Sequence, residues 1–368
     1  MLKSKVEKSC LAAALQSVMR AVSNRSTQPI LGNTLIEFEE GRLSFTGTDL
    51  EIGLKTSVEA QVEDSGSLSV PAKLLYDIIS NLPGKEIDLY QEKEHELLIK
   101  QGRSKYSIRT LPASEYPLFP EFEKGNICAV SADILQQAIR QVIFASSQDE
   151  SRRILTGVLL EVEGSNLKLV ATDGHRLALR NLSLSEPSQE ETSLIIPGRT
   201  LNELSRLLSS GEGEVMIRVL SNQVAFIYNK IVLVSRIIEG KYPNYRQVIP
   251  ANLPYESIVS REEISKAVKG AHILAKEGSH VVKMSFSAER IAVTAGTQDV
   301  GDVYEEISAQ YNGEDEDIAF NAKYLLDILG NLDEEMLQIK SGTSLSPAII
   351  RPMGEEEYTY VVMPVKIG

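Results

Sequence analysis

An acid, a base and an arginine lie within one short stretch, Ala171–Leu179, whose sequence is ATDGHRLAL. Asp173 and His175 are the residue types with which a catalytic triad orients and activates a nucleophile, and both can also bind metal ions. A triad needs a nucleophile within hydrogen-bond reach, but no G-x-S-x-G elbow or comparable motif accompanies the pair. Three interpretations remain: half of a triad, part of a metal site, or a turn that supports another function.

The other candidate metal ligands do not follow known metal-binding patterns. Of the histidines at 95, 175, 272 and 280, only His272 and His280 lie near each other, at a spacing that is not typical of zinc sites. The acidic run 312–317 lacks the ligand order of a calcium loop, and the sequence contains no P-loop and no G-x-G-x-x-G motif. We therefore expect no metal, no cofactor and no catalytic residue. An enzyme that uses Asp173 and His175 is the alternative.

The composition is that of a globular protein with more than one domain. The 368 residues are 42% hydrophobic and 24% charged, which is enough material for two or three domains of ordinary size. The formal net charge is −13. That charge argues only weakly against a nucleic-acid partner, because it does not report how the charges are distributed over the surface.

Targeting signals are absent from the sequence, which predicts a cytoplasmic protein. The first residues, MLKSKVEKS, lack the apolar core of a signal peptide, and no apolar run reaches the ~18 residues that a membrane span needs. Cys10 and Cys128 lie far apart in the chain. They are expected to be reduced, buried thiols in a reducing compartment.

The stretch with Asp173 belongs to a pattern that recurs along the chain. Residues 165–173 resemble residues 41–49 and 289–296, at offsets of 124 residues. A Pro/Asn-x-Lys/Arg element recurs at residues 70–79, 196–205 and 320–329, and a Tyr-Pro element recurs at 111–117 and 237–243. Several elements in the same order at nearly constant offsets indicate three homologous domains, with expected boundaries at 1–124, 125–250 and 251–368.

Each copy combines two helices with short strands. Apolar residues with the spacing of one helix face open the copies, at Leu11, Leu15, Val18 and Val22, at Leu135, Ile139 and Val142, and at Ile264, Val268 and Ala271. The recurring Pro-x-Lys/Arg element is expected to begin a second helix, since proline suits a first helical turn. Alternating apolar residues predict strands at 35–38, 43–45, 87–90, 97–99 and 106–108. We therefore expect an α+β fold with antiparallel sheets.

The repeat also bears on the opening question. The equivalent turn of the first copy, Thr48–Ile52, keeps the aspartate as Asp49 but has no histidine. This pattern is typical of a shared turn, in which the aspartate caps backbone amides and Gly174 adopts a positive φ. A structural or binding role for Asp173 and His175 is therefore favoured over a catalytic one.

Basic residues recur on the two helices of each copy and just after the first helix. If these helices share one surface, an acidic protein would carry one basic lining, which attracts phosphates without recognising bases. Solvated helix faces are the simpler interpretation for any single residue. The residues concerned are Lys5, Lys8, Arg20, Arg25 and Lys73 in the first copy, Arg140, Arg152, Arg153, Arg199 and Arg206 in the second, and Lys266, Lys269, Lys276 and Lys323 in the third.

Four motifs together carry a resemblance to a known family. They are ATDGHRLAL at 171–179, KYPNYR at 241–246 followed by VIP at 248–250, FNAKY at 320–324, and YVVMPVKI at 360–367. With them the whole chain resembles the beta subunit of bacterial DNA polymerase III, the sliding clamp family. The resemblance implies the DNA-clamp fold and a head-to-tail homodimer ring with helices lining its hole. It also implies a processivity factor on double-stranded DNA of any sequence.

The resemblance further implies a pocket that binds short peptides. Its partners would be the polymerase III alpha subunit, the clamp loader, and other DNA polymerases and repair proteins. Residues that match the pocket are Leu155, Thr172, Gly174, His175, Arg176, Leu177, Pro243, Val248, Asn321, Tyr324, Val361, Val362, Met363 and Pro364. Leu177, Val248, Val361 and Met363 would form an apolar floor, while His175, Arg176 and Asn321 would offer hydrogen-bond donors.

Two further sets of residues follow from the same resemblance. Residues at or beside expected DNA contacts are Arg25, Lys73, Gln148, Arg152, Arg153 and Arg199. Residues of the expected ring joint are Lys105, Tyr106, Ile108, Ile273, Leu274, Glu305 and Glu306. There a strand of residues 105–109 would pair with residues 304–307 of the second copy, and their opposite charges fit cross-strand pairing. A three-domain scaffold that does not encircle DNA is the other alternative.

Overall fold

The computed structural model describes residues 2–23, 28–122, 126–188, 190–209, 211–297 and 301–366. These residues form two compact units, one of residues 1–133 and 203–237, the other of residues 134–202 and 238–368. In these ranges no helix is long and apolar enough to cross a membrane. The limits of both units fall inside the second copy predicted from the sequence, and the reason lies in the strand pairing.

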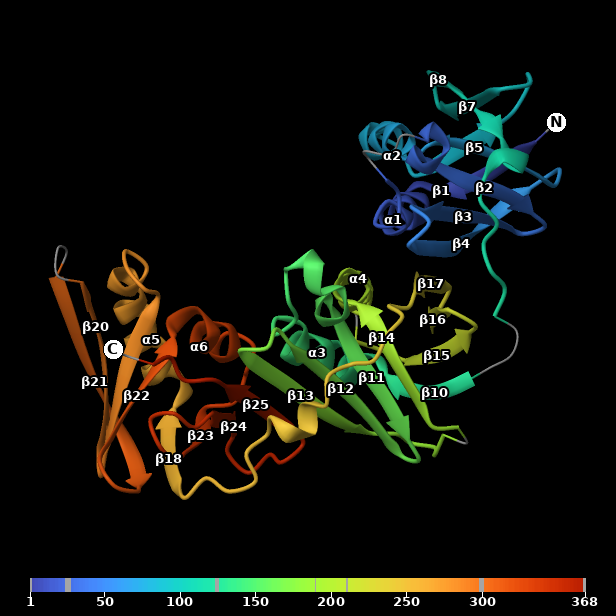
Figure 1. The fold of residues 1–368 in the computed structure, drawn as a ribbon. Helices are drawn as coiled ribbons and strands as arrows, with labels where there is room; N and C mark the ends of the chain where they lie inside the picture. Colours follow the sequence, from blue (N-terminus) through green and yellow to red (C-terminus); the bar gives the residue numbers. More distant parts are fainter. Residues whose placement is uncertain are drawn as a thin grey trace. The chain divides into compact units, whose positions relative to one another are not determined.

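The order of elements repeats three times, as strand, helix, four strands, helix, three strands (Figure 1). The first copy contains β1 (Lys3–Glu7), α1 (Lys8–Val18), β2 (Asn33–Glu39), β3 (Arg42–Thr48), β4 (Ile52–Val62), β5 (Gly66–Pro71), α2 (Ala72–Asn81), β6 (Glu86–Tyr90), β7 (Glu96–Gln101) and β8 (Ser104–Arg109), with a short η1 (Pro29–Gly32), β9 (Leu111–Pro112) and η2 (Ala113–Glu115). The strands predicted in this copy are all confirmed.

The second and third copies follow the same order. The second contains β10 (Asn126–Ser131), α3 (Ala132–Ile143), η3 (Glu150–Thr156), β11 (Gly157–Glu163), β12 (Asn166–Thr172), β13 (Arg176–Ser183), β14 (Thr192–Pro197), α4 (Gly198–Leu207), β15 (Glu214–Leu220), β16 (Gln223–Tyr228), β17 (Ile231–Arg236) and η4 (Tyr245–Gln247). The third contains β18 (Tyr255–Ser260), α5 (Arg261–Ala275), β19 (Val281–Ser287), β20 (Arg290–Thr297), β21 (Gly301–Asn312), β22 (Glu316–Asn321), α6 (Ala322–Leu329), β23 (Met336–Ser341), β24 (Ala348–Pro352) and β25 (Tyr358–Val362). This threefold order confirms the homologous copies and the α+β class.

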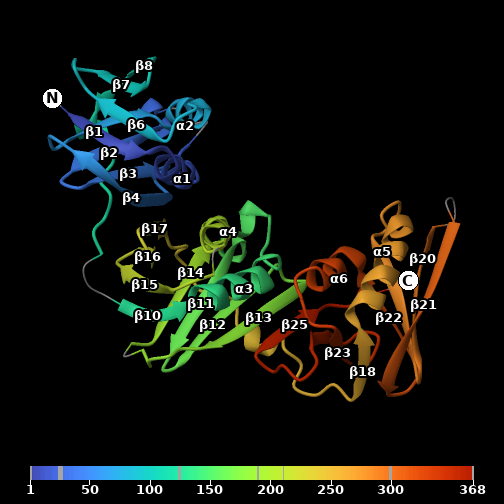
Figure 2. The same cartoon turned by 180° about the vertical axis from the view of Figure 1, so that it is seen from behind.

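Antiparallel pairing between copies explains the two units. In the first unit, β17 of the second copy pairs with β4 of the first, so one sheet has the order β10-β15-β16-β17-β4-β1-β6-β7-β8. In the second unit, β13 of the second copy pairs with β25 of the third, within the order β14-β11-β12-β13-β25-β24-β23-β18-β21-β20-β19-β22. The strands of the second copy are thus divided between two sheets (Figure 2).

The helices bury the apolar faces that the spacing predicted. On α1, the residues Leu11, Leu15 and Val18 are fully buried. On α5, the exposed fraction is at most 2% for Ile264, Val268 and Ala271. Within their units, α1 packs on α2 and on β3 and β4, and α5 packs on α6 and on β19–β21. α1 ends at Val18, so the expected extension of this helix to Val22 was wrong, although Val22 is buried in the following turn.

The second helix of each copy begins one residue later than predicted. Pro71 is the last residue of β5 and the N-cap of α2, with φ −56° and ψ 111°, so it lies outside the first helical turn. A proline is tolerated there because neither its missing N–H nor its fixed φ disturbs the helix. In the third copy the equivalent residue is Asn321, whose side-chain Oδ1 accepts a hydrogen bond from the Lys323 amide of α6 at 2.9 Å.

The cysteines differ from the expectation at one position. Cys128 is buried, and burial raises the pKa of its thiol to about 11. Cys10 is exposed on α1, because the apolar face of that helix is formed by Leu11 and its neighbours at helical spacing. The prediction of two buried thiols was therefore wrong for Cys10.

This difference predicts a simple labelling result. At pH 8, a thiol-specific reagent should modify Cys10 and leave Cys128 unmodified, because a buried thiol with a raised pKa holds little thiolate. Mass spectrometry of the folded protein should give one label per chain, and the guanidinium-unfolded protein should give two. Two labels on the folded chain would show that Cys128 is accessible.

Candidate functional site

Four hydrogen bonds between side chains and backbone hold the turn Thr172–Arg176. The Asp173 Oδ1 atom accepts from the backbone amides of His175 at 2.9 Å and Arg176 at 3.1 Å. The Thr172 hydroxyl donates to the Arg176 carbonyl at 2.6 Å and accepts from the Gly174 amide at 3.1 Å. Gly174 has φ +92°, which favours glycine. The interpretation of this stretch as an aspartate-capped turn is confirmed.

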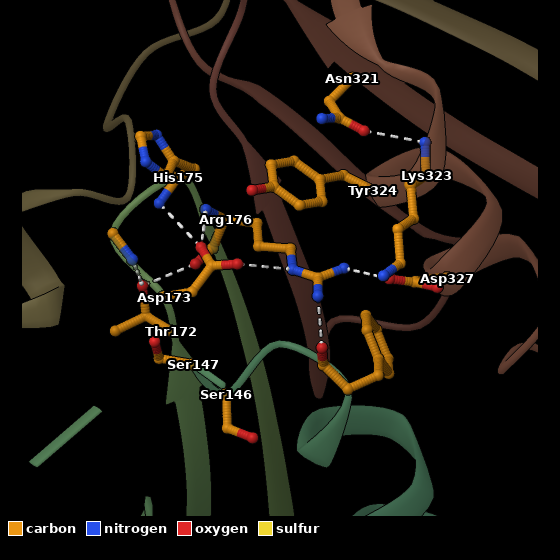
Figure 3. A network of polar contacts seen from close by, with 12 residues as sticks. Ser146, Ser147, Thr172, Asp173, His175, Arg176, Asn321, Lys323, Tyr324 and Asp327 are labelled. Carbon is orange, nitrogen blue, oxygen red and sulfur yellow. Dashed lines mark hydrogen bonds and ion pairs between the residues drawn. The ribbon is translucent and has the colours of Figure 1, made fainter. Parts of the chain in front are cut away.

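Arg176 extends from this turn into a buried polar network (Figure 3). Its guanidinium donates from Nε to Asp173 Oδ2 at 3.1 Å, from Nη1 to Asp327 Oδ2 at 2.5 Å, and from Nη2 to the Phe144 carbonyl at 2.6 Å. The side chain is only 8% exposed. One arginine therefore joins the turn, the end of α3 and helix α6.

The same guanidinium lies over an aromatic ring. The Arg176 Cζ atom is 4.4 Å from the centroid of the Tyr324 ring, a distance at which cations and aromatic faces attract each other. Burial acts to lower the pKa of Arg176, but Tyr360, Asp327 and Asp173 outweigh it and the pKa is raised. The Tyr360 hydroxyl donates to the Tyr324 carbonyl at 3.0 Å. Tyr324 is therefore fixed on both its ring and its backbone.

The donors expected for a peptide differ in their availability. Arg176 uses all three of its nitrogens within the chain, so it differs from the expectation of a donor that faces a partner. Asn321 uses its oxygen to cap α6, which leaves the amide nitrogen as its donor. The His175 side chain is exposed beside the turn and points away from Arg176 in Figure 3.

Strand pairing brings the turn next to the C-terminal segment. Leu177 pairs with Val361 and Arg176 with Val362, and the Met363 amide donates to the His175 carbonyl at 2.9 Å. The turn and the C-terminal segment of the predicted pocket therefore lie side by side, although His175 and Met363 are almost 190 residues apart in the sequence. All of them lie in the second compact unit.

An apolar cluster lies beneath these segments. Leu177 and Val361 are at most 1% exposed and pack with Tyr242 and Tyr245, and Leu155 packs against the cluster while partly exposed. Val248 is 37% exposed, and Met363 and Pro364 are half-buried. The expected floor thus has two layers: Leu177 and Val361 are buried support, while Val248 and Met363 present apolar surface. The exposed Pro243 adds to that surface.

Two groups that bind Arg176, and an exposed leucine in a loop that leads into the same sheet, were missed from the sequence. Asp327 and the Phe144 carbonyl bind Arg176, and only the position of Asp327 one helical turn after Tyr324 offered a signal for it. Leu345 is 68% exposed in the loop before β24, whose Ala348 pairs with Val362. An exposed leucine in a polar segment was a weak signal for an apolar contact surface.

The first unit contains the same turn with the same hydrogen bonds. In the turn Thr48–Ile52, the Asp49 Oδ1 atom accepts from the backbone amides of Glu51 at 3.1 Å and Ile52 at 2.9 Å. The threonine hydroxyl again donates across the turn at 2.9 Å and accepts an amide at 3.0 Å. The Arg236 amide donates to the Glu51 carbonyl at 3.0 Å, just as Met363 donates to His175. Two junctions between copies are therefore built on one backbone frame.

The side chains at the first junction fill that frame. Gly53 pairs with Val234 where Leu177 pairs with Val361. A Cβ at Gly53 would lie 3.2 Å from the Phe119 ring, so this ring occupies the space that a side chain would take. Phe122 is 8% exposed and packs on Ala225 and Val234, whereas Val248, at the equivalent position of the second junction, is 37% exposed. The second junction therefore presents the apolar surface that the first one covers.

The described residues among those predicted to contact DNA are exposed, and two of them pair with acids. The Lys73 Nζ atom lies 3.1 Å from Asp77, and the Arg152 Nε atom lies 3.0 Å from Asp149. Gln148, Arg153 and Arg199 lie at the surface of the second copy, and Arg25 lies outside the described residues. Among the other basic residues, Lys8 donates to the carbonyls of Ser80 and Leu82 at the end of α2. The ion pairs of Lys73 and Arg152 offset part of the positive charge that was predicted for a DNA-facing lining.

The strands predicted for the ring joint have unpaired edges within the described chain. β8 ends its sheet and pairs with β7 alone, and Tyr106 on it is 41% exposed while Ile108 is 4% exposed. β21 pairs with β20 through residues 301–308 and with β18 only through residues 309–312. Ile273 on α5 is 63% exposed, an unusual position for a large apolar side chain.

The described residues contain no candidate metal site, since no group of three or more of their His, Cys, Asp or Glu side chains lies close enough to hold an ion. His272 and His280 do lie near each other, with ring centroids 6.3 Å apart. Asp173 is committed to the turn and to Arg176, so it does not orient His175 as a triad acid would.

Family models match all three copies. They describe the N-terminal, central and C-terminal domains of the DNA polymerase III beta subunit, and they match residues 2–120, 129–244 and 246–366. The beta sliding clamp of Bacillus subtilis is 33% identical over 99% of this chain and 100% of its own length. The beta sliding clamp of Synechococcus elongatus is 34% identical over 97% of each chain.

Solved structures agree with these relatives. The DNA polymerase sliding clamp of Bacillus subtilis superposes with a TM-score of 0.96 at 33% identity, covering 100% of both chains. A sliding clamp of Pseudomonas aeruginosa bound to griselimycin superposes with a TM-score of 0.95 at 33% identity, again covering 100% of both. The chain therefore belongs to the family of bacterial DNA polymerase III beta subunits, the beta sliding clamps.

Proposed function

We propose that this chain is a sliding clamp whose groove beside the turn Thr172–Arg176 binds short peptides of replication and repair proteins. The observation that carries this proposal is the second junction, where the frame shared by both junctions leaves Val248, Met363 and His175 at the surface. The family is one of non-catalytic processivity factors. The clamp tethers a polymerase to DNA and catalyses no reaction itself.

The chemistry of the groove fits a peptide with apolar and amide side chains. Val248 and Pro243 offer apolar surface for a leucine or an aromatic ring, and the flexible Met363 side chain adapts to different shapes. The exposed His175 and the amide nitrogen of Asn321, whose oxygen caps α6, would bind a glutamine side chain or the peptide backbone. Such a groove suits many partners, which include the polymerase III alpha subunit, the clamp loader, and other polymerases and repair proteins.

Ring closure uses a second copy of the chain. β8 of one copy adds to the open edge of β21 at residues 301–308 of the other, which removes two exposed strand edges at once. Lys105 and Arg109 on β8 then face the acidic segment with Glu305 and Glu306, and Tyr106 packs toward Ile273 and Leu274. Two such contacts close a symmetric ring by head-to-tail association.

Duplex DNA passes through this ring without a sequence preference. Gln148, Arg153, Arg199 and Lys73 contact phosphates, and ion pairs such as Lys73–Asp77 keep the contacts weak enough for sliding. Closure of the ring, rather than affinity, prevents escape, which is how a protein of net charge −13 serves DNA. The protein acts in the cytoplasm, where a bacterial chromosome is replicated.

The groove is tested by fluorescence anisotropy with a labelled peptide that carries a glutamine followed by leucine and phenylalanine. The wild-type chain should bind it saturably, and a chain that lacks residues 363–368 should not, because Met363 and Pro364 border the groove. The variant Leu118→Ala is the matched control, since Leu118 is 99% exposed on the linker of the first copy.

Three outcomes would contradict the proposal. A folded wild-type chain that does not bind the peptide would contradict the groove and favour a scaffold with the clamp fold only. Equal binding by the truncated chain would place the peptide elsewhere. Catalytic turnover that is lost in the variant His175→Ala would favour the alternative of an enzyme.

A further inference from the structure

Arg152 was predicted to contact DNA, but its side chain also reaches the turn Thr172–Arg176. Its Nη1 donates to the Asp173 carbonyl at 2.7 Å, Nη2 to the Ser147 hydroxyl at 3.1 Å, and Nε to Asp149 Oδ2 at 3.0 Å. The Asp173 carbonyl belongs to the turn Thr172–Arg176. The exposed segment that holds Arg152 is thereby joined to the turn by one side chain.

The segment 147–155 is folded around this guanidinium. Asp149 Oδ1 accepts from the amide and hydroxyl of Ser151 at 3.0 and 2.6 Å, and the Ser147 amide donates to the Leu155 carbonyl at 2.8 Å. Arg152 itself has φ −104° and ψ 53°, a break in the helical geometry of η3. A loop closed by these bonds holds the arginine in one position and limits the directions it can take.

The bond from Arg152 acts on the backbone carbonyl of Asp173. Thr172 and the Asp173 carboxylate fix the amides of Gly174, His175 and Arg176, while the Asp173 carbonyl is directed outward to Arg152. Bonds from a charged donor are shorter and stronger than neutral ones. The orientation of this carbonyl sets the peptide plane that leads into Gly174 and therefore where His175 stands.

We propose that Arg152 is a positioning residue of the partner groove, which fixes the turn through the Asp173 carbonyl and does not act mainly as a DNA contact. This inference rests on the proposed function. Peptide affinity should depend on the shape of the arginine, since a lysine keeps the charge but cannot donate to Asp173, Ser147 and Asp149 together. The neighbouring Arg153 provides the comparison, because it is exposed on the same segment.

The test compares Arg152→Lys, Arg152→Ala and Arg153→Ala with the wild type. Peptide affinity is measured by anisotropy, and exchange of the amides at 172–176 is measured by mass spectrometry. DNA retention is measured by gel filtration with a short duplex at several salt concentrations and without a clamp loader, because the loader would itself use the groove. Arg152→Lys and Arg152→Ala should weaken peptide binding about tenfold or more, as expected when a charged hydrogen bond is lost, and should speed exchange in the turn. Arg153→Ala should leave peptide affinity within about twofold.

The outcomes separate the inference from the proposed function. Arg152→Lys that loses peptide affinity and keeps wild-type DNA retention supports a positioning role. Wild-type peptide affinity in both Arg152 variants would overturn the inference and leave the groove intact, as would a loss of DNA retention alone. A folded wild-type chain that does not bind the peptide would overturn the proposed function, and this inference with it.

Discussion

Replacing Arg176 by alanine should lower the free energy of unfolding by about 3–5 kcal/mol, the range found when one partner of a buried ion pair is removed. The same substitution should abolish peptide binding. The substitution leaves Asp173 and Asp327 without the cation they share. It also removes the contact with the Tyr324 ring and leaves the Phe144 carbonyl without its donor. Urea unfolding followed by circular dichroism measures the first effect, and anisotropy measures the second.

An exposed arginine in the same unit provides the control. Arg246 lies 3.1 Å from Glu161 with its side chain 59% exposed, so Arg246→Ala should cost less than about 1 kcal/mol. If Arg176→Ala were no more damaging than Arg246→Ala, the buried network would not hold the turn and α6 together. Unchanged peptide affinity in Arg176→Ala would show that the groove does not depend on this network.

The second large effect is expected at the ring joint. Ile273→Asp should convert a dimer of twice 40.6 kDa into a monomer of 40.6 kDa at micromolar concentration. The side chain is 63% exposed within the chain, so a charge there costs little in the monomer. In the proposed dimer the same charge would be buried without a partner, which is strongly unfavourable. Light scattering coupled to gel filtration measures the mass directly.

Leu220→Asp is the matched control for this variant. Leu220 is 47% exposed on β15 and lies outside the proposed joint, so its substitution should leave the dimer intact. If the wild type is a monomer under these conditions, the edges of β8 and β21 do not close a ring. If Ile273→Asp remains a dimer, the joint lies elsewhere.

The turn was predictable because its determinants are local. An aspartate two and three residues before the amides it caps, together with a glycine at a positive φ, specifies the backbone from four or five residues. The repeat at Asp49 supported that prediction, and the structure reproduces its hydrogen bonds there. The apolar faces of α1, α3 and α5 were predictable for the same reason, since helical spacing is a local signal.

The partners of Arg176 were not predictable, because they are distant in the sequence. Asp327 lies 151 residues away and the Phe144 carbonyl 32 residues away, and no spacing rule connects them to the arginine. The target of Arg152 was missed for a different reason. A sequence that places basic residues on one segment indicates surface charge, but it does not show that one of them reaches a backbone carbonyl.

The division of the second copy between two units also could not be predicted from the repeats. Repeats predicted where each copy begins and ends, but the pairing of β17 with β4 and of β13 with β25 joins strands of neighbouring copies. Edge strands pair wherever a partner edge with matching side chains is available. The same rule applies to β8 and β21, whose edges are open within the described chain and define the proposed joint.

The two junctions show how one frame can serve two purposes. At the first, Gly53 and Ala225 are small, and the rings of Phe119 and Phe122 fill the space. At the second, Leu177 and Ile349 are large and buried, and the smaller Val248 stays exposed. Exchange of large and small side chains at equivalent positions preserves packing density while moving apolar surface from inside to outside.

The central claim is that two copies close around duplex DNA, and retention on circular DNA tests it most directly. The protein is loaded on a nicked circular plasmid with a bacterial clamp loader and ATP, gel-filtered in high salt, and filtered again after the plasmid is cut once. The account predicts that the protein elutes with the circle and is released from the linear molecule, because a closed ring slides off a free end. Equal retention on circular and linear DNA would show binding by affinity and would contradict encirclement.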